Sequence, residues 1–332
     1  MRHRHRIVKR AAIALLVILL LAALFLGIQL WDKQHSGTGS DNKPVVNTSV
    51  VEYNGENYVP KKDIETFLVI GIDRKDTADE VDKTVQADFL MLFVLDKNTE
   101  KTTAIHINRD TMTNVNRLDI AGNTIGTEMK QIALAYNYAY SDEGSVNCRN
   151  TADAVSGLLR GVKVNHYLSL TMEAVPVLND LVGGVEVTVL DDFTGIDDTL
   201  VKGKDVVLHG EQALLYVRAR GSLENTTNLE RMKRQRQYVE ALSKAATARL
   251  ESDSDFALHV ADKLGAYVKY DSTEYRLQEF AKRFDRYDFL GVRTIEGTAA
   301  TGKEYIEFYP DTEALQQLVM ELFYDKQATT GN

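Results

Sequence analysis

Three apolar runs, each closed by polar residues, constrain the fold of this chain more than any other feature. They read FLVIGID (67–73), DFLMLFVLD (88–96) and TTAIHINRD (102–110). Strands that are apolar on both faces need helices on both sides of their sheet. Helical patterns follow over five further segments, at 128–141, 150–162, 171–182, 210–220 and 228–251. This mixture predicts a three-layer α/β/α sandwich with a central mixed sheet.

Two hairpins are expected outside these segments. Asn54-Gly55 separates two short β-prone runs, which is typical of a tight hairpin. Near the C-terminus, FLGVRTIEG (289–297) and EYIEFYP (304–310) predict a second hairpin with glycines around its turn, followed by a closing helix. The sequence leaves open whether residues 254–330 form a separate subdomain.

A long apolar segment precedes this domain. Residues 11–31 reach the roughly 20 residues that a helix needs to cross a bilayer. The first ten residues carry five positive charges and no acid, and basic flanks stay on the cytoplasmic side. A cleaved signal peptide is the alternative, but it would have a shorter apolar region and a small-residue cleavage site. The prediction is a cytoplasmic tail (1–10), a single transmembrane anchor (11–31), a flexible linker (32–50) and an extracellular domain (51–330).

Acidic residues lie at the ends of the three apolar runs. Asp73 ends the first, Asp88 begins the second, and Asp110 follows Arg109 at the end of the third. Ligands of open α/β sheets bind beyond the carboxyl ends of the strands. Acids there can hold Mg²⁺, which takes one or two protein carboxylates and completes its shell with water and phosphate oxygens. The alternative is that these acids only cap the turns at the strand ends.

Six basic residues lie between 218 and 236, in a chain whose formal net charge is −9. Arg218 and Arg220 directly follow an apolar stretch, where a guanidinium needs a partner, and phosphate matches its planar fork. On the next helix, a spacing of three places Arg231 and Arg234 on one face. A solvated basic face, or pairing with acids of the domain, is the alternative. Nucleic acid is not expected, because the predicted topology puts the cluster across the membrane from the chromosome. A phosphorylated small molecule or lipid is the expected ligand.

In their order and spacing, these segments resemble the LytR-CpsA-Psr (LCP) family. The resemblance covers about residues 64–245 and rests on FLVIGIDRK, QADFLMLFVLD, TTAIHINRDT, LVGGVEVTV, LHGEQALLYVRAR and RMKRQR. It implies a membrane-anchored phosphotransferase of bacterial cell walls. Such an enzyme moves an anionic glycopolymer, a teichoic acid or capsular polysaccharide, from a polyprenyl diphosphate carrier to peptidoglycan through a phosphodiester bond. The resemblance also implies an apolar pocket for the prenyl chain.

The resemblance assigns the acids to a metal and the arginines to the diphosphate. Asp73 and Asp88 resemble the carboxylates that hold Mg²⁺. Asp110 resembles an acid that orients an arginine or accepts the proton of the acceptor hydroxyl, and with the arginines it forms the expected catalytic set. The residues that resemble diphosphate ligands are Arg109, Arg218, Arg220, Arg231 and Gln235.

The chain departs from the family pattern at three positions. Asn108 stands where the family often has proline, and Ala133 stands where it has asparagine. Asn228 replaces an acid three residues before Arg231; asparagine can hydrogen-bond to the arginine but cannot act as a base. Asn228 therefore keeps a second hypothesis open, a non-catalytic protein that binds the lipid diphosphate or its polymer. Hydrolysis of the diphosphate without an acceptor is a third.

Two residue types are interpreted as structural. His106 lies within an apolar strand and is expected to be a buried core histidine. Cys148 is the single cysteine, so the chain has no internal disulfide, and its thiol is expected to be a small buried side chain.

Overall fold

The computed structural model describes residues 50–73, 85–137, 144–219, 228–253, 255–270, 287–303 and 305–327. The predicted cytoplasmic tail, membrane anchor and nearly all of the linker lie outside these residues. Among the helices that are described, none is both long enough and apolar enough to cross a membrane.

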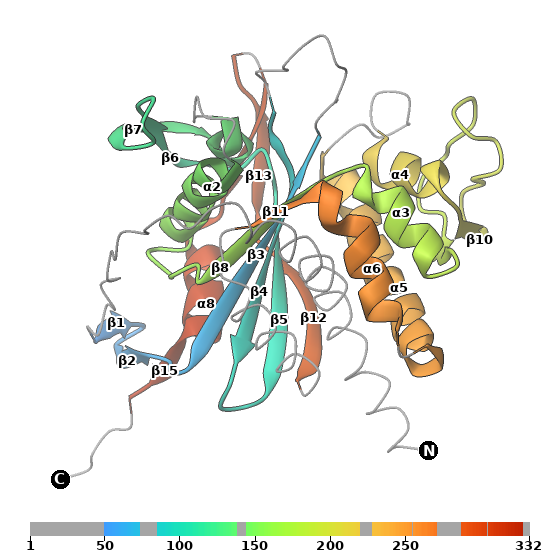
Figure 1. Ribbon diagram of the computed structural model, residues 1–332. Helices are drawn as coiled ribbons and strands as arrows, with labels where there is room; N and C mark the ends of the chain where they lie inside the picture. The colour runs from blue at the N-terminus through green and yellow to red at the C-terminus, as the bar shows by residue number, and fades with distance from the viewer. Residues whose placement is uncertain are drawn as a thin grey trace.

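A six-stranded mixed sheet lies at the centre of the domain (Figure 1). Strand β3 pairs antiparallel with β4 and parallel with β8, and β5 pairs antiparallel with β4 and parallel with β12. The predicted central mixed sheet is thus confirmed. In spatial order its strands are β11 (Val268–Tyr270), β8 (His166–Thr171), β3 (Ile64–Ile72), β4 (Ala87–Asp96), β5 (Lys101–Ile107) and β12 (Asp288–Thr294).

Helices cover both faces of this sheet, because its central strands are apolar on both faces. Along β3, Phe67 and Val69 belong to one buried cluster, whereas Leu68 and Ile70 belong to the other. The helices on the first face are α3 (Ala174–Leu181), α4 (Glu211–Arg218), α5 (Asn228–Ser252) and α6 (Phe256–Leu264), and those on the second are α2 (Gly144–Leu158) and α8 (Thr312–Phe323). Figure 1 shows the two groups on either side of the sheet.

Short strand pairs surround the three layers. At the Asn-Gly turn both residues have positive φ, 53° at Asn54 and 75° at Gly55, so the predicted first hairpin is confirmed. The described residues also include the 3₁₀ helices η1 (Ile132–Asn137) and η2 (Gly265–Tyr267). The strands of these smaller sheets are β1 (Val51–Tyr53), β2 (Glu56–Pro60), β15 (Tyr324–Lys326), β6 (Met112–Leu118), β7 (Thr124–Gln131), β9 (Val185–Thr188), β10 (Asp205–Leu208), β13 (Gly297–Thr301) and β14 (Ile306–Pro310).

The helix predicted over 128–141 is wrong at its start, and its end, from 138, lies outside the described residues. Residues up to Gln131 belong to β7, which pairs antiparallel with β6, and only the short η1 follows before the described residues end at Asn137. The backbone of this segment is hydrogen-bonded to β6, a strand that the sequence pattern does not predict. Tertiary pairing therefore overrides a local helical pattern.

The second predicted hairpin is correct in one strand and wrong in the other. The predicted strand at 304–310 is present as β14, and it pairs with β13 across a turn that contains Gly302. The segment 288–294 instead forms β12 at the edge of the central sheet. Phe289 and Val292 of β12 pack against the first buried cluster, which holds this strand beside β5. The C-terminal segment therefore contributes both an edge strand and, through α8, part of the second cluster.

Candidate active site

Three strand ends meet at one edge of the central sheet. Asp73 directly follows β3, Asp88 is the second residue of β4, and Arg109 lies two residues beyond β5. Because β4 runs antiparallel to both neighbours, its start lies beside the ends of β3 and β5. The sheet topology thus brings together side chains that are 15 to 36 positions apart in the sequence.

Two helices complete the site from the first face of the sheet. Helix α4 ends at Arg218, and α5 presents Arg231 and Gln235 one turn apart. A cavity of about 290 Å³ lies between these elements. Its lining residues are Asp73, Asp88, Arg109, Met172, Arg218, Arg231 and Gln235.

Each carboxylate of this cavity binds at least one guanidinium. Asp88 accepts hydrogen bonds from Arg109 and, at 3.5 Å, from Arg231, and its backbone carbonyl accepts a second bond from Arg231 at 3.4 Å. Asp73 accepts a hydrogen bond from Arg218. Three arginines face two aspartates, so the part of the lining that the structure describes carries an excess of one positive charge in an acidic protein. Such a cavity attracts an anion.

The three arginines lie at different depths. The side chain of Arg231 is 5% exposed and that of Arg109 is 12% exposed, whereas that of Arg218 is 41% exposed. Arg109 and Arg231 are therefore held in place near the base of the cavity by Asp88. Arg218 lies at its mouth, where a side chain can move to meet a ligand.

Asp110 lies behind Arg109 and does not line the cavity. Its carboxylate is 3.5 Å from Arg109 Nε and accepts a hydrogen bond of 3.3 Å from Gln131. Arg109 also donates to Gln86, a residue that the sequence reasoning missed. Asp110 and Gln86 thus hold the guanidinium of Arg109 from two sides, and this geometry favours an orienting role for Asp110.

Among the described residues, the other arginines of the basic cluster, Arg234 and Arg236, do not line this cavity. Arg220 lies outside the described residues. Arg231 and Arg234 lie one turn apart on α5, but they bind different partners: Arg234 binds Asp191 at 2.8 Å and the carbonyl of Ala219. Its guanidinium also lies 5.5 Å from the ring of Phe193. The two arginines therefore have different roles. Arg234 is buried in a structural ion pair, whereas Arg231 lines the cavity.

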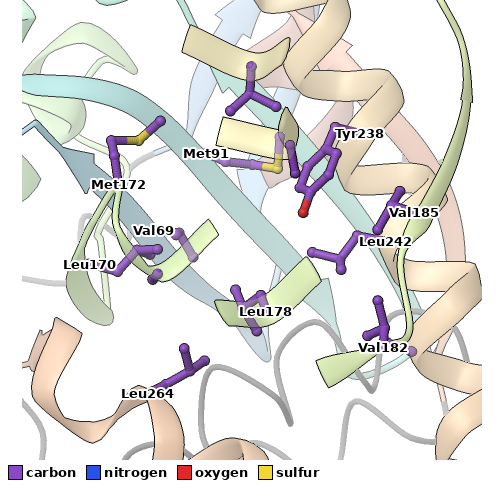
Figure 2. Close-up of a cluster of buried hydrophobic side chains, with 14 of the residues drawn as sticks. Val69, Met91, Leu170, Met172, Leu178, Val182, Val185, Tyr238, Leu242 and Leu264 are labelled. Atoms are coloured by element: carbon purple, nitrogen blue, oxygen red, sulfur yellow. The ribbon is translucent and has the colours of Figure 1, made fainter. Parts of the chain in front are cut away.

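A second, apolar cavity adjoins the charged one. It has a volume of about 90 Å³ and lies between the sheet, α3 and α5. Met172 and Gln235 line both cavities. Figure 2 shows part of its wall, with Tyr238 and Leu242 of α5 facing residues of the sheet and α3. Burial raises the pKa of Tyr238, so its hydroxyl stays protonated and donates to Asn179 at 3.3 Å. The residues described around the apolar cavity therefore carry no charge.

The acids of the charged cavity fit a single hard cation. Oδ1 of Asp73 is buried and has no hydrogen-bond partner among the described residues, although it is a carboxylate oxygen. Among the described residues, Asp88 is the only other acid of the lining, and they contain no cluster of three or more acidic, histidine or cysteine side chains. Two carboxylates suit Mg²⁺, which keeps several waters and takes further oxygens from phosphate.

His106 lies next to the site but inside the core. Its ring is 5.0 Å from that of Phe89, and its Nδ1 has no hydrogen-bond partner within the described part of the chain. Burial, and then the charges of Arg236 and Arg231, lower its pKa from 6.5 to about 3. The ring therefore stays neutral near neutral pH and serves packing.

Comparison with known proteins identifies the family. The model of the LytR_cpsA_psr family matches residues 28–323. The chain belongs to the LytR-CpsA-Psr family. The polyisoprenyl-teichoic acid–peptidoglycan teichoic acid transferase TagU of Halalkalibacterium halodurans is 28% identical over 241 residues, which are 71% of this chain and 72% of that protein. TagU of Enterococcus faecalis is 29% identical over 233 residues, 69% of this chain and 67% of that protein.

Solved structures of this LCP fold are similar as well. Protein gbs0355 of Streptococcus agalactiae superposes with a TM-score of 0.62 at 18% identity, covering 81% of this chain and 90% of its own. TagT bound to LI-WTA gives a TM-score of 0.57 at 20% identity, covering 79% and 90%. TagV of B. subtilis gives 0.55 at 24% identity, covering 79% and 96%. At these identities the similarity establishes the fold.

Proposed function

We propose that this protein is a phosphotransferase that moves a teichoic acid or a related anionic glycopolymer from a polyprenyl diphosphate carrier to peptidoglycan. The printed activity of the TagU relatives, which are teichoic acid transferases to peptidoglycan, supports the polymer and the acceptor. Residues 11–31 anchor the chain in the membrane, and the domain faces the cell wall, where both substrates meet.

The two adjoining cavities indicate the chemical class of the donor. The arginine-lined cavity and the uncharged apolar cavity share Met172 and Gln235, so one ligand can occupy both with an anionic head and an apolar tail. A polyprenyl diphosphate has this form. The apolar cavity is small for a long prenyl chain, and the adaptable side chains of Met91 and Met172 in its wall can move to enlarge it.

The arginines supply what the reaction requires. The oxygen of the acceptor hydroxyl forms a bond to the phosphorus that bears the polymer, while the bond from this phosphorus to the bridging oxygen breaks. The electron pair stays on the leaving polyprenyl phosphate, which becomes more anionic, and the hydroxyl proton is released. Arg109 and Arg231 are held ready for that charge, and Arg218 closes on it from the mouth. Asp110 acts through Arg109.

A divalent cation fits the same proposal. Asp73 and Asp88 would hold Mg²⁺, and the free oxygen of Asp73 supports this assignment. When bound, Mg²⁺ supplies positive charge to the phosphate oxygens.

The test is transfer by the full chain, purified in mild detergent. A synthetic polyprenyl-diphosphate oligosaccharide is mixed with a muropeptide, with and without Mg²⁺, and the phosphodiester product is measured by mass spectrometry. Arg218→Ala is compared with Lys233→Ala, which removes an exposed cation of the same basic cluster that pairs with Glu230. Transfer is expected for wild type and K233A and at least about tenfold less for R218A, because a charge-assisted contact to phosphate is lost.

Other outcomes separate the competing functions. Release of polyprenyl phosphate without transfer would indicate a hydrolase. Tight binding of the donor with no turnover would indicate a binding protein. Equal losses in R218A and K233A would contradict the assignment of the cavity.

A further inference from the structure

Two asparagines link the loop after β5 to the start of α5. Nδ2 of Asn228, the first residue of α5, donates to Oδ1 of Asn108. Oδ1 of Asn228 accepts a hydrogen bond of 2.6 Å from Arg231. Asn108 is 4% exposed, and its Oδ1 also accepts from the backbone N–H of Asp110 at 3.0 Å. These contacts form a continuous path from the Arg109-Asp110 loop to Arg231.

The direction of every bond in this path is fixed by its two ends. A backbone N–H at Asp110 can only donate, so the atom of Asn108 that faces it must be the oxygen. The atom of Asn228 that meets this oxygen must then be the amide nitrogen, which leaves its own oxygen facing Arg231. A guanidinium can only donate, so the second end agrees with the first. Position 228 must therefore present a donor on one side and an acceptor on the other.

We propose that Asn108 and Asn228 act as a pair of positioning residues that aim Arg231 at Asp88 and at the anion in the cavity. The proposal rests on the function proposed above. The side chain of Arg231 is 5% exposed, and two hydrogen bonds of 3.4–3.5 Å join it to Asp88. The 2.6 Å bond from Arg231 to Asn228 is shorter than either of its bonds to Asp88.

The pair makes an acid at position 228 unfavourable. Aspartate in place of Asn228 still accepts from Arg231, but its second oxygen meets Oδ1 of Asn108, and two acceptors repel. The added charge beside Arg231 therefore comes with a lost hydrogen bond to the loop. Truncating Asn108 to alanine should remove this repulsion, because the opposing oxygen is gone. Asn108 also borders a separate cavity of about 650 Å³, from which water can then reach the second carboxylate oxygen that Asn228→Asp introduces.

The experiment is a double-substitution cycle in the full chain purified in detergent. Wild type, Asn228→Asp, Asn108→Ala and the double variant are compared. Calorimetry gives the affinity for farnesyl diphosphate and for farnesol, which has the same apolar tail without phosphate. In the wild-type background, N228D is expected to lower affinity for the diphosphate by up to about tenfold, the upper end for the loss of one hydrogen bond. In the N108A background, N228D should change it less than about twofold.

Two controls separate positioning from general damage. Affinity for farnesol should stay the same in all four proteins, because Arg231 contacts only the phosphate end. Asn98→Asp, at an exposed turn whose amide also donates to a backbone carbonyl, should leave both affinities unchanged. Equal effects of N228D in the two backgrounds, or parallel losses for farnesol and the diphosphate, would overturn the proposal.

Failure of the proposed function gives a different pattern. If wild type does not bind farnesyl diphosphate, the proposed ligand is wrong. Urea unfolding of the same four proteins then tests whether Asn108 and Asn228 are coupled. A loss of stability on N228D that disappears in the N108A background supports the pairing, and equal losses in both backgrounds refute it.

Discussion

Replacing Arg234 by methionine should destabilise the fold without weakening binding of the anion. The side chain of Arg234 is 1% exposed and that of its partner Asp191 is 13% exposed, so the ion pair is buried. Removal of one partner leaves Asp191 without its cation and the carbonyl of Ala219 without its donor. Breaking a buried pair in this way costs about 3–5 kcal/mol. This is a large part of the roughly 5–15 kcal/mol that stabilises a domain.

Urea unfolding followed by circular dichroism measures the effect. With a slope of about 3 kcal/mol per molar urea, the expected loss moves the midpoint down by about 1–1.7 M. Lys233→Met is the matched control, since it removes the neighbouring cation from the same helix, where it is 54% exposed and pairs with Glu230. An exposed pair contributes about 0–1 kcal/mol, so the K233M midpoint should hardly move.

A second substitution tests the cause. Asp191→Asn in the R234M background removes the unpaired charge and should recover part of the lost stability. At a urea concentration where R234M is folded, its affinity for farnesyl diphosphate should stay within about threefold of wild type. A midpoint shift no larger than that of K233M, or a loss of affinity in folded R234M, would refute the structural role of Arg234.

Three further predictions follow from the core and the cavities. His106 binds no proton until about pH 3, whereas the unfolded chain binds one near pH 6.5, so stability falls by about 1.4 kcal/mol per unit as pH drops below 6.5. Urea unfolding at pH 7, 6 and 5 should show this slope reduced in His106→Leu and kept in His259→Gln, and an unchanged slope in H106L would contradict it. Leu242→Trp, which fills the apolar cavity, should lower affinity for farnesyl diphosphate at least about tenfold and spare inorganic pyrophosphate, unlike the equally overpacked Leu318→Trp of the other face. Asp73→Asn should abolish the gain in pyrophosphate affinity on adding Mg²⁺, and Asp325→Asn at an exposed position should keep it.

The sequence predicts the centre of the fold better than its periphery. Runs that are apolar on both faces, such as 67–73 and 88–96, have few alternatives to central strands, and the structure places them there. The segment 128–131 carries no such constraint, because its pairing with β6 depends on a strand whose residues are mixed in polarity. The pairing predicted for the segment 288–294 is wrong for a related reason, since its actual partner β5 lies nearly 190 positions away in the sequence.

The site follows the same division. The positions of Asp73, Asp88 and Arg109 at strand ends are readable in the sequence, because strand ends lie at sheet edges wherever the sheet forms. The side chains that pair with the arginines cannot be predicted from the sequence. Helical spacing groups Arg231 with Arg234, yet the carboxylate of Asp191, 43 positions away, binds only one of them. The contact between Asn108 and Asn228 joins two departures from the family pattern across 120 positions, and only the fold reveals it.

The arrangement of charges implies an order of events when an anion arrives. Asp88 holds two guanidiniums that are almost fully buried, so this part of the cavity is set before binding. Asp73 holds Arg218, whose side chain is 41% exposed and can turn toward a phosphate in the mouth. That movement would free both oxygens of Asp73 at the moment when phosphate oxygens become available beside it, which is the oxygen set that Mg²⁺ requires. We therefore expect the anion and Mg²⁺ to strengthen each other's binding, since Asp73 would exchange its pairing with Arg218 for the metal.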